Sequence, residues 1–430
     1  MYLLPKYIVI LFALIVIDYV AGLKIAPARG KTRLLYLMIS IAANLVVLSF
    51  FKYYNFFNQN LTLIVGGTGG STILPVLHLV LPVGLSFHTF QAMSYTIEVY
   101  RGNQTAERHL GYYALYVLFY PQLVAGPIER PQNLLPQFRT PQPFRYENFR
   151  DGLRQMAWGL FKKTTIADPL APIVNDVYNR PQDFGGSTLL LATILFSIQI
   201  YCDFSGYSDI ALGSAKCMGY NLMTNFRRPY WATSISEFWK RWHISLSTWF
   251  RDYLYIPLGG NRVSRIRNCC NLLLVFLISG LWHGANWTFV IWGALHGIYL
   301  MLEMALAKVP VSRIGGAMAR LRTLVFVGLA WVFFRANSVQ DAFYILGGII
   351  GLHSHEGTVG SRSGFDAVDK VGILVSVVTL LAVEWAQEKK WIVSLDDIPL
   401  WLRWSMYFLL ICWILIFGLR QSAQFIYFQF

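Results

Sequence analysis

Charged residues are scarce in this chain of 430 residues: 13% are Asp, Glu, Lys or Arg, whereas 55% are hydrophobic and 16% aromatic. Soluble domains carry about 25% charged residues. The shortage of charge excludes an ordinary soluble domain, and apolar runs repeatedly reach the length of about 20 residues that crosses a bilayer. We therefore expect an all-α polytopic membrane protein, with about ten or eleven membrane segments in a single domain that covers residues 1–430.

Cysteines are also few, and they lack the spacing of metal ligands. Most of the five lie in apolar segments, which favours core packing over a disulfide framework or a zinc site. We therefore predict no metal. The five are Cys202, Cys217, Cys269, Cys270 and Cys412.

Acidic residues are nearly missing from three stretches that carry a net charge of +15, against +14 for the whole chain. They are Lys24 to Arg33, Arg130 to Lys163 and Thr224 to Asn268. The positive-inside rule places the two larger stretches in the cytoplasm. There they face the membrane surface, attract phosphate-rich ligands, or do both. Because the basic residues alternate with membrane segments, nucleic-acid binding is not expected.

No charged residue at all occurs between Arg267 and Glu303. The run is long enough to cross a bilayer, but Gly280, Gly284 and Asn286 interrupt it around His283. We therefore predict a broken or re-entrant helix, with His283 at membrane depth beside irregular backbone.

An ionisable residue in that position is a candidate functional site, because burying it in a membrane is costly. Imidazole titrates near neutral pH, which suits His283 to moving a proton to or from a reacting hydroxyl. The alternative is a packed histidine that bonds a neighbouring carbonyl. The residues alone leave both interpretations open.

Four apolar runs precede the second basic stretch: Leu3 to Leu23, Leu34 to Phe51, Leu74 to Val99 and Leu110 to Val124. The first lacks a basic start and a cleavage site, so we interpret it as an anchor that is retained. Four complete crossings would put the Lys24 arm opposite the Arg130 stretch. We therefore expect that one run does not cross completely.

Aromatic and aliphatic residues recur at helical spacing from Ala232 to Leu258, which predicts one interfacial helix, and Ser234 with Glu237 predicts a capping box at its start. His243 falls at the edge of the apolar stripe. It either lines the mouth of a cavity or is an interfacial histidine without a chemical role.

Other polar residues lie within apolar segments. Asp203 belongs to CDFSGYSD, which joins two apolar runs, and such a carboxylate must be paired or wet. A role in capping a helix is as well supported as direct chemistry. Gly293 and Gly297 predict a close-packing helix face, on which His296 is expected to hydrogen-bond across helices.

Several motifs together resemble the membrane-bound O-acyltransferase superfamily, over most of the chain. Within it the nearest branch comprises the bacterial membrane proteins for O-acetylation of alginate and peptidoglycan, and the D-alanyl transferase of teichoic acid is more distant. The motifs are LPVGLSFHTFQAMSYTIEVYRG, FYPQLVAGPIERP, YCDFSGYSDIALG, NFRRPYWATSISEFWKRWHISLSTWFRDYLYIPLGGNR, SGLWHGANWTFVIWGALHG, WVFFRA and FIYFQF.

The resemblance implies a ring of tilted helices, some broken or re-entrant, around a central tunnel that meets a cytoplasmic funnel. It also implies that His283 is catalytic and that His243 is a second functional residue. Two departures stand out: a first membrane segment expected in the family is missing, and His88 stands where an aromatic residue is common.

We therefore expect a multi-pass O-acetyltransferase of the bacterial inner membrane that passes an acetyl group across the membrane for O-acetylation of an exported polysaccharide, alginate-like or peptidoglycan. The donor is a cytoplasmic thioester, acetyl-CoA or an acyl carrier, and no cofactor is permanently bound. The expected partners are membrane lipid and a separate periplasmic acetyltransferase. Residues assigned to the substrate and donor are Arg227, Arg228, Lys240, Arg241, Asp203 and Asn286, which is also a candidate oxyanion donor.

Two alternatives remain. One is D-alanyl transfer to teichoic acid, in which a charged carrier protein replaces the free coenzyme. The other is a transporter or channel, in which His283 and Asp203 relay protons or ions.

Overall fold

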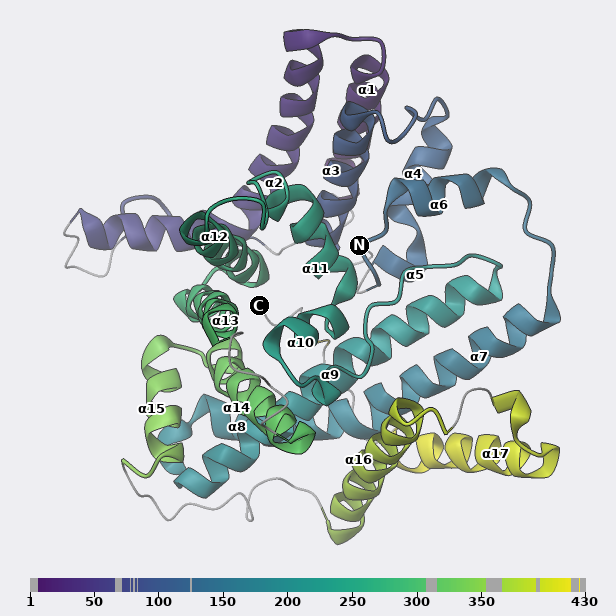
Figure 1. The fold of residues 1–430 in the computed structure, drawn as a ribbon, viewed down its shortest axis with the longest axis vertical. Coiled ribbons are helices and arrows are strands. Elements are labelled where there is room, and N and C mark those ends of the chain that lie inside the picture. Colours follow the sequence, from purple (N-terminus) through teal and green to yellow (C-terminus); the bar gives the residue numbers. More distant parts are fainter. Residues whose placement is uncertain are drawn as a thin grey trace. The chain divides into compact units, whose positions relative to one another are not determined.

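The computed structural model describes residues 7–65, 72–77, 79, 82, 84–123, 126–306, 315–352, 366–391, 395–418 and 425. Every regular element in these ranges is helical, which confirms the predicted all-α class (Figure 1). Seven of the described helices are long and apolar enough to cross a membrane: α1 (Tyr7–Ile25), α2 (Gly30–Ile64), α9 (Gly186–Cys217), α12 (Arg265–His283), α13 (Trp287–Leu306), α14 (Gly316–Arg335) and α17 (Leu400–Phe417). The number of membrane segments and the single domain stay predictions.

The chain divides into two compact units, and each is treated by itself. Unit 1 comprises Met1–Gly152 and Ser214–Met223, and unit 2 comprises Leu153–Gly213 and Thr224–Phe430. The helices that begin in unit 1 are α1 (Tyr7–Ile25), α2 (Gly30–Ile64), α3 (Leu85–Arg101), α4 (Leu110–Leu118), α5 (Tyr120–Leu123), α6 (Pro131–Arg139) and α7 (Tyr146–Phe161), of which α7 continues into unit 2.

Hydrogen bonds within unit 1 show which ends of its helices share a side. Near the start of α2, Arg33 Nη2 donates to the carbonyl of Val99 in the last turn of α3, at 3.1 Å. Gln132 Nε2, in the first turn of α6, donates to Glu98 Oε2 at 2.6 Å. The Lys24 to Arg33 arm therefore lies on the same side as the start of the second basic stretch, which the positive-inside rule assigns to the cytoplasm.

Helix length favours the fourth apolar run as the one that does not cross completely. Helix α4 has nine residues and α5 has four. Nine helical residues rise about 13 Å, less than half of a bilayer core of about 30 Å. After α5 the chain returns to the side from which α4 started, because α6 is joined to the end of α3.

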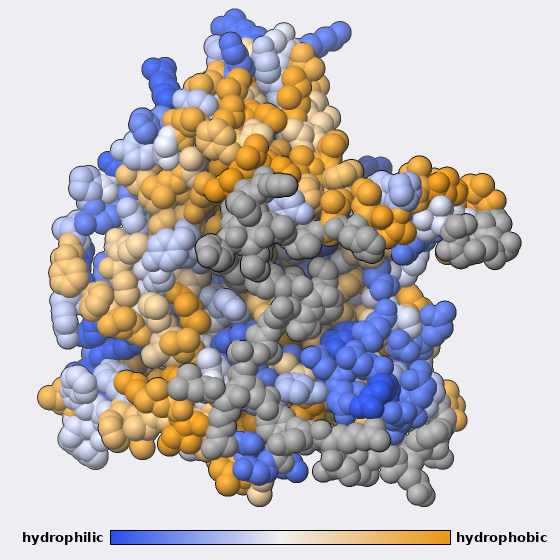
Figure 2. All heavy atoms as spheres, turned by 180° about the vertical axis from the view of Figure 1, so that it is seen from behind, coloured by the Kyte–Doolittle hydropathy of each residue, from blue (hydrophilic) through white to orange (hydrophobic). Residues whose placement is uncertain are grey.

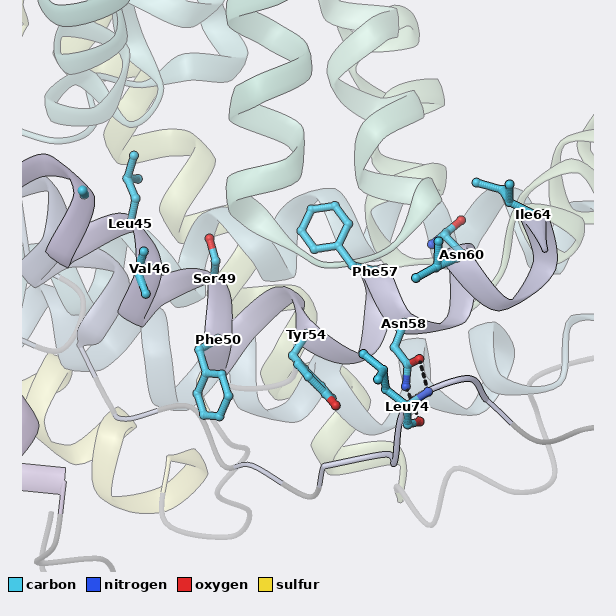
Figure 3. A pocket seen from close by; sticks show the side chains of 12 residues that line it. Leu45, Val46, Ser49, Phe50, Tyr54, Phe57, Asn58, Asn60, Ile64 and Leu74 are labelled. Carbon is cyan, nitrogen blue, oxygen red and sulfur yellow. Dashed lines mark hydrogen bonds between the residues drawn. The ribbon is translucent and has the colours of Figure 1, made fainter. Parts of the chain in front are cut away.

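Helix α2 carries an apolar cavity of about 720 Å³ along its length (Figure 3). Phe50, Tyr54 and Phe57 line it, and the Asn58 amide pairs with the backbone of Leu74 at 2.7 and 3.1 Å. The cavity belongs to unit 1, which contains neither of the two predicted functional histidines. Its apolar lining suits contact with lipid.

Unit 2 contains the remaining helices. They are the π-helix η1 (Lys162–Ala167), α8 (Asp168–Asn179), η2 (Pro181–Asp183), α9 (Gly186–Cys217), η3 (Pro229–Trp231), α10 (Ile235–Arg241), α11 (Ile244–Phe250), the π-helix η4 (Arg251–Tyr255), α12 (Arg265–His283), α13 (Trp287–Leu306), α14 (Gly316–Arg335), α15 (Val339–Ile349), α16 (Ala367–Glu388), η7 (Leu395–Asp397) and α17 (Leu400–Phe417). The last residues of α9 extend into unit 1.

Two predicted element boundaries are wrong. The CDFSGYSD segment does not join two helices, because α9 is one helix of 32 residues. Conversely, the stretch from Ala232 to Leu258 is not one helix. It breaks at His243, whose φ of 43° and ψ of 54° are left-handed, and η4 then replaces the last α-helical turn. Half of the predicted capping box is confirmed, since Ser234 Oγ accepts from the Glu237 N–H at 3.1 Å, but the Glu237 carboxylate accepts from the N–H of Thr233 at 2.8 Å, one residue before Ser234.

Helices α12 and α13 form a hairpin whose interface is set by glycine. A Cβ added to Gly280 would lie 2.2 Å from the carbonyl oxygen of Phe289, and one added to Gly293 would lie 2.2 Å from that of Phe276. The predicted close-packing face at Gly293 and Gly297 is confirmed. The hairpin places the break after His283 at one end of both helices.

Candidate active site

His283 is the last residue of α12, and the predicted break follows it. Gly284 is extended, with φ of −159° and ψ of 149°, and a Cβ there would clash with the Phe289 ring. His283 is only 5% exposed. Its ring centroid lies 4.9 Å from that of Trp292 and 5.4 Å from that of Phe334. Three features therefore surround His283: the end of a helix, a glycine that follows it, and an aromatic lining that keeps water away from the imidazole.

His243 is fully buried within the protein, with 0% exposure. Its predicted position at the membrane surface stays a prediction. Its Nδ1 lies 3.0 Å from Oδ1 of Asn225, and its ring centroid lies 4.6 Å from that of Phe204. Burial lowers the pKa of His243 to about 3, so the imidazole is neutral at pH 7.

Asn225 explains why the helix breaks at His243. Its backbone carbonyl accepts from the N–H of Ile244 at 2.9 Å, and its Oδ1 accepts from the N–H and hydroxyl of Ser245 at 3.3 and 3.0 Å. These bonds satisfy the first donors of α11 from outside the helix. Asn225 was not predicted, and only a long-range contact identifies it.

Both histidines pack against one indole. The centroid of Trp282 lies 6.5 Å from that of His243 and 4.9 Å from that of His283. The structure therefore brings the two predicted functional histidines into one neighbourhood of unit 2. Their separate roles stay predictions. Trp282 is a further site residue, and its only sequence signal was its place next to His283.

A polar cavity of about 490 Å³ adjoins the break after His283. Its lining is rich in amides and includes one cation: Asn175, Asn179, Asn286, Asn337 and Arg335, with Ala285, Phe289 and Ala336. Asn286 Oδ1 accepts from the N–H of Thr288 at 3.1 Å, and its Nδ2 donates to the Asn337 carbonyl at 3.2 Å. Asn286 thus starts α13 and shapes the cavity, while its predicted contact with substrate stays a prediction.

Arg335, from the WVFFRA motif, is the charged group of this cavity. It is 7% exposed, its Nη2 donates to Asn175 Oδ1 at 2.6 Å, and its guanidinium lies over the Tyr178 ring at 5.5 Å. Among the described residues it makes no ion pair with a carboxylate. A buried cation beside four amides suits the recognition of hydroxyl and anionic groups.

Asp203 is held in an ion pair that the sequence did not reveal. Lys163 Nζ lies 2.7 Å from Asp203 Oδ1 and 2.7 Å from Asp168 Oδ1. Lys162 nearby contacts Asp209 at 2.5 Å. The close crossing of Gly159 and Gly206 brings the lysines of η1 to the aspartates of α9. This geometry satisfies the requirement that a buried carboxylate be paired, and it leaves the predicted donor contact of Asp203 untested.

The four basic residues assigned to the donor divide into two pairs. Arg228 Nε lies 2.9 Å from Glu388, and Arg241 Nη2 lies 2.6 Å from Glu237 and 3.1 Å from Glu388. Arg227 and Lys240 are exposed and make no ion pair among the described residues. These last two are therefore the ones available to an anionic ligand.

The acids around this basic surface are ionised at neutral pH. Burial alone would raise the pKa of Glu237, but hydrogen bonds from Thr233 and Arg241 outweigh it and hold the pKa below its usual value. Two further cations adjoin the same segment. The guanidinium of Arg320 lies 5.3 Å from the Trp231 ring, and Arg322 Nη2 donates to the Thr233 carbonyl at 3.5 Å.

The remaining predicted positions are structural in character. Trp239 Nε1 donates to His296 Nδ1 at 3.3 Å, which is the predicted bond across helices. His88 is buried in α3 of unit 1. All five cysteines are free thiols, and the described residues contain no group of three or more His, Cys, Asp and Glu that could hold a metal ion. Of the terminal FIYFQF motif only Phe425 is described, and its ring packs against Phe204 at 5.9 Å.

Known proteins match this chain over a region that includes both His243 and His283. The model of the membrane-bound O-acyltransferase family matches residues 103–340. A probable alginate O-acetylase of Pseudomonas aeruginosa is 39% identical over 85% of this chain and 70% of its own length. A peptidoglycan O-acetyltransferase of Helicobacter pylori is 38% identical over 81% and 71%. A teichoic acid D-alanyltransferase of Streptococcus thermophilus is 29% identical over 62% and 68%.

Proposed function

Because the chain belongs to the membrane-bound O-acyltransferase family and is a multi-pass O-acetyltransferase of the bacterial inner membrane, we propose that it carries acetyl groups across that membrane. The donor is a cytoplasmic thioester, acetyl-CoA, and the destination is a hydroxyl of an exported polysaccharide. Relatives named for alginate and for peptidoglycan support an acidic or amino-sugar polymer of this kind.

His283 acts as the general base. It takes the proton of the acceptor hydroxyl while the hydroxyl oxygen attacks the thioester carbonyl carbon, and the carbon–sulfur bond then breaks. The proton passes to the departing thiolate. Asn286 Nδ2 already donates to the Asn337 carbonyl. Its second N–H and the backbone N–H groups at the break are the candidate donors for the oxyanion.

One observation carries this proposal: His283 ends helix α12 against an aromatic lining, two residues before the polar cavity that Ala285 and Asn286 line. The aromatic side, formed by Trp282, Trp292 and Phe334, keeps water from a reactive thioester. The polar side offers the amides and the guanidinium of Arg335 to a hydroxylated acceptor. A base between these two environments is suited to acyl transfer.

The donor side is the basic segment of Thr224 to Asn268. Arg227 and Lys240 are free to contact phosphates of the donor, whereas Arg228 and Arg241 hold the segment against Glu388. On the opposite side, a separate acetyltransferase outside the inner membrane supplies the immediate acceptor hydroxyl and then passes the acetyl group to the polysaccharide, so that this chain performs the first half of the modification.

The test uses purified protein in liposomes with acetyl-CoA labelled in its acetyl group, and follows hydrolysis and transfer. We expect His283→Ala to lower the rate about a hundredfold or more, because a positioned acid–base group contributes about that much. Folding and insertion should persist, since the break glycine tolerates a smaller neighbour. Full activity of the folded variant would remove His283 from the mechanism.

A second buried histidine supplies the matched control. His88→Ala, in α3 of unit 1, which contains neither functional histidine, should lower thermal stability, while the folded fraction retains its turnover. His243→Ala should reduce turnover, because its imidazole packs on the indole that His283 also contacts. Equal losses in all three variants would indicate a general packing effect and would contradict the special role of His283.

D-alanyl transfer is the second candidate, and the teichoic acid D-alanyltransferases among the relatives favour it. It predicts that a D-alanylated carrier protein supports turnover and that acetyl-CoA does not. A transporter predicts ion or proton flux without thioester cleavage. The labelled donor separates all three functions in one preparation.

A further inference from the structure

Besides the cavity of unit 2 that Arg335 lines, unit 1 contains a charged cavity of its own, on the side of the Lys24 to Arg33 arm. Its volume is about 580 Å³. Arg33 and Arg108 line it together with the polar side chains of Gln104 and Thr105, and apolar residues such as Leu23 form the rest of its wall. The cavity is therefore amphipathic, with two guanidinium groups beside hydrocarbon.

The two arginines are fixed by their surroundings but are not neutralised. Arg33 donates through Nη2 to the Val99 carbonyl and lies over the Tyr100 ring at 5.4 Å, while its buried Nε has no hydrogen-bond partner among the described residues. The backbone of Arg108 is held by the Tyr19 hydroxyl, which donates to its carbonyl at 2.6 Å. Neither guanidinium makes an ion pair with a described carboxylate.

The neighbouring acids are already engaged elsewhere. Glu98 is paired with Arg101 at 3.2 Å and accepts from Gln132, and Glu107 is paired with Arg139 at 2.5 Å. Lys24 at the end of α1, Arg29 in the turn and Lys31 at the start of α2 are exposed and add further positive charge. Figure 2 shows hydrophilic residues gathered at the tip of this otherwise hydrophobic hairpin. The cavity thus has an uncompensated positive potential.

We propose that this cavity binds the phosphate of an anionic phospholipid headgroup in the cytoplasmic leaflet. Two guanidinium groups suit the two free oxygens of a phosphodiester. The hydrocarbon side of the cavity is formed by Leu23, Ala26 and Val99, and Leu34, next to Arg33 on α2, is 45% exposed. In a phospholipid the charged headgroup adjoins the acyl chains, just as the guanidinium groups adjoin the hydrocarbon wall of this cavity. The cytoplasmic leaflet is the one that carries anionic lipid.

The test measures lipid binding to the full chain in uncharged detergent by native mass spectrometry. The probes are dioleoyl phosphatidylglycerol and dioleoyl phosphatidylcholine. We expect phosphatidylglycerol to bind at least about tenfold more tightly, and Arg33→Gln with Arg108→Gln to remove most of that preference. Arg108→Gln alone, at an exposed side chain, should remove part of it without affecting folding.

The matched control is Arg29→Gln with Lys31→Gln, which removes the same charge from the same turn outside the cavity. A site predicts that this control keeps the preference to within about threefold. An equal loss in both double variants would overturn the proposal, because it would mean diffuse attraction to a charged surface. Equal binding of both lipids would overturn it as well, and so would displacement of the lipid by millimolar inorganic phosphate, which would identify a site for free anions.

Discussion

Removing the Lys163 ammonium group is the most informative perturbation of the buried polar network in unit 2. Lys163 Nζ lies 2.7 Å from a carboxylate oxygen of Asp203 and 2.7 Å from one of Asp168. The three side chains are 10%, 3% and 6% exposed, in that order. Lys163→Met therefore leaves two buried carboxylates without the cation that they share.

Deleting one partner of a buried ion pair costs about 3–5 kcal/mol, because the remaining charge stays desolvated. Lys163 serves two carboxylates, so we expect Lys163→Met to reach the upper end of that range. Asp203→Asn should cost less, since Lys163 keeps Asp168. Replacing both aspartates by asparagine in the Lys163→Met background removes all three charges of this triad, and should recover most of the lost stability.

The assay is the free energy of unfolding in mixed micelles, measured by detergent titration. Lys216→Met provides the comparison, because its ion pair with Asp151 at 3.3 Å is about one-third exposed and such pairs contribute about 1 kcal/mol or less. If Lys163→Met proved as stable as Lys216→Met, the network would not stabilise the fold as argued.

The same variants test whether Asp203 also serves the donor. A structural aspartate predicts that Asp203→Asn lowers stability while the folded fraction binds acetyl-CoA with its parent affinity. A loss of donor affinity beyond the loss of folded protein would return Asp203 to the donor site.

Three further outcomes are expected. Arg227→Gln should weaken acetyl-CoA binding about tenfold in uncharged detergent, and the loss should be smaller at high salt. Arg228→Gln should act mainly by releasing Glu388. Unchanged acetyl-CoA affinity in the variant that carries both substitutions would exclude a donor role for this pair. Gly293→Val should prevent folding of the α12–α13 hairpin, seen as loss of a monodisperse product, because its Cβ has 2.2 Å to a carbonyl oxygen. Folding lowers the pKa of Glu237, so the ionised carboxylate contributes stability above its ordinary pKa of 4.5, and this contribution is lost as the pH falls below that value. Glu237→Gln should therefore remove part of the decrease in melting temperature that acidification causes.

Local sequence signals predicted those features that local chemistry controls. The break after His283 coincides with Gly284, where the Phe289 ring leaves no room for a Cβ. The close packing at Gly293 follows from the lack of a side chain in an apolar segment. The cap at Ser234 needs only a hydroxyl placed three residues before an N–H.

Features that depend on distant partners could not be predicted in this way. The aromatic spacing around His243 is helical, yet the backbone turns there because Asn225 supplies the bonds that start α11. Asp203 is in mid-helix because Lys163, forty positions earlier, neutralises it. The periodicity of a sequence indicates which residues face a core. It does not indicate which distant residue will supply a hydrogen bond or a neutralising charge that the local sequence lacks.

Strained backbone adds a further argument about how the two sides of the site are joined. Among the described residues only Arg228, His243 and Lys390 are non-glycine residues with positive φ. Two of them bound the segment that carries the basic donor surface at one end and the buried imidazole at the other. Such strain persists only where surrounding contacts hold it. Here Glu388 holds Arg228 and Asn225 holds His243. We therefore predict that a change at the proposed donor surface is transmitted through this segment to the ring that packs, with His283, on Trp282.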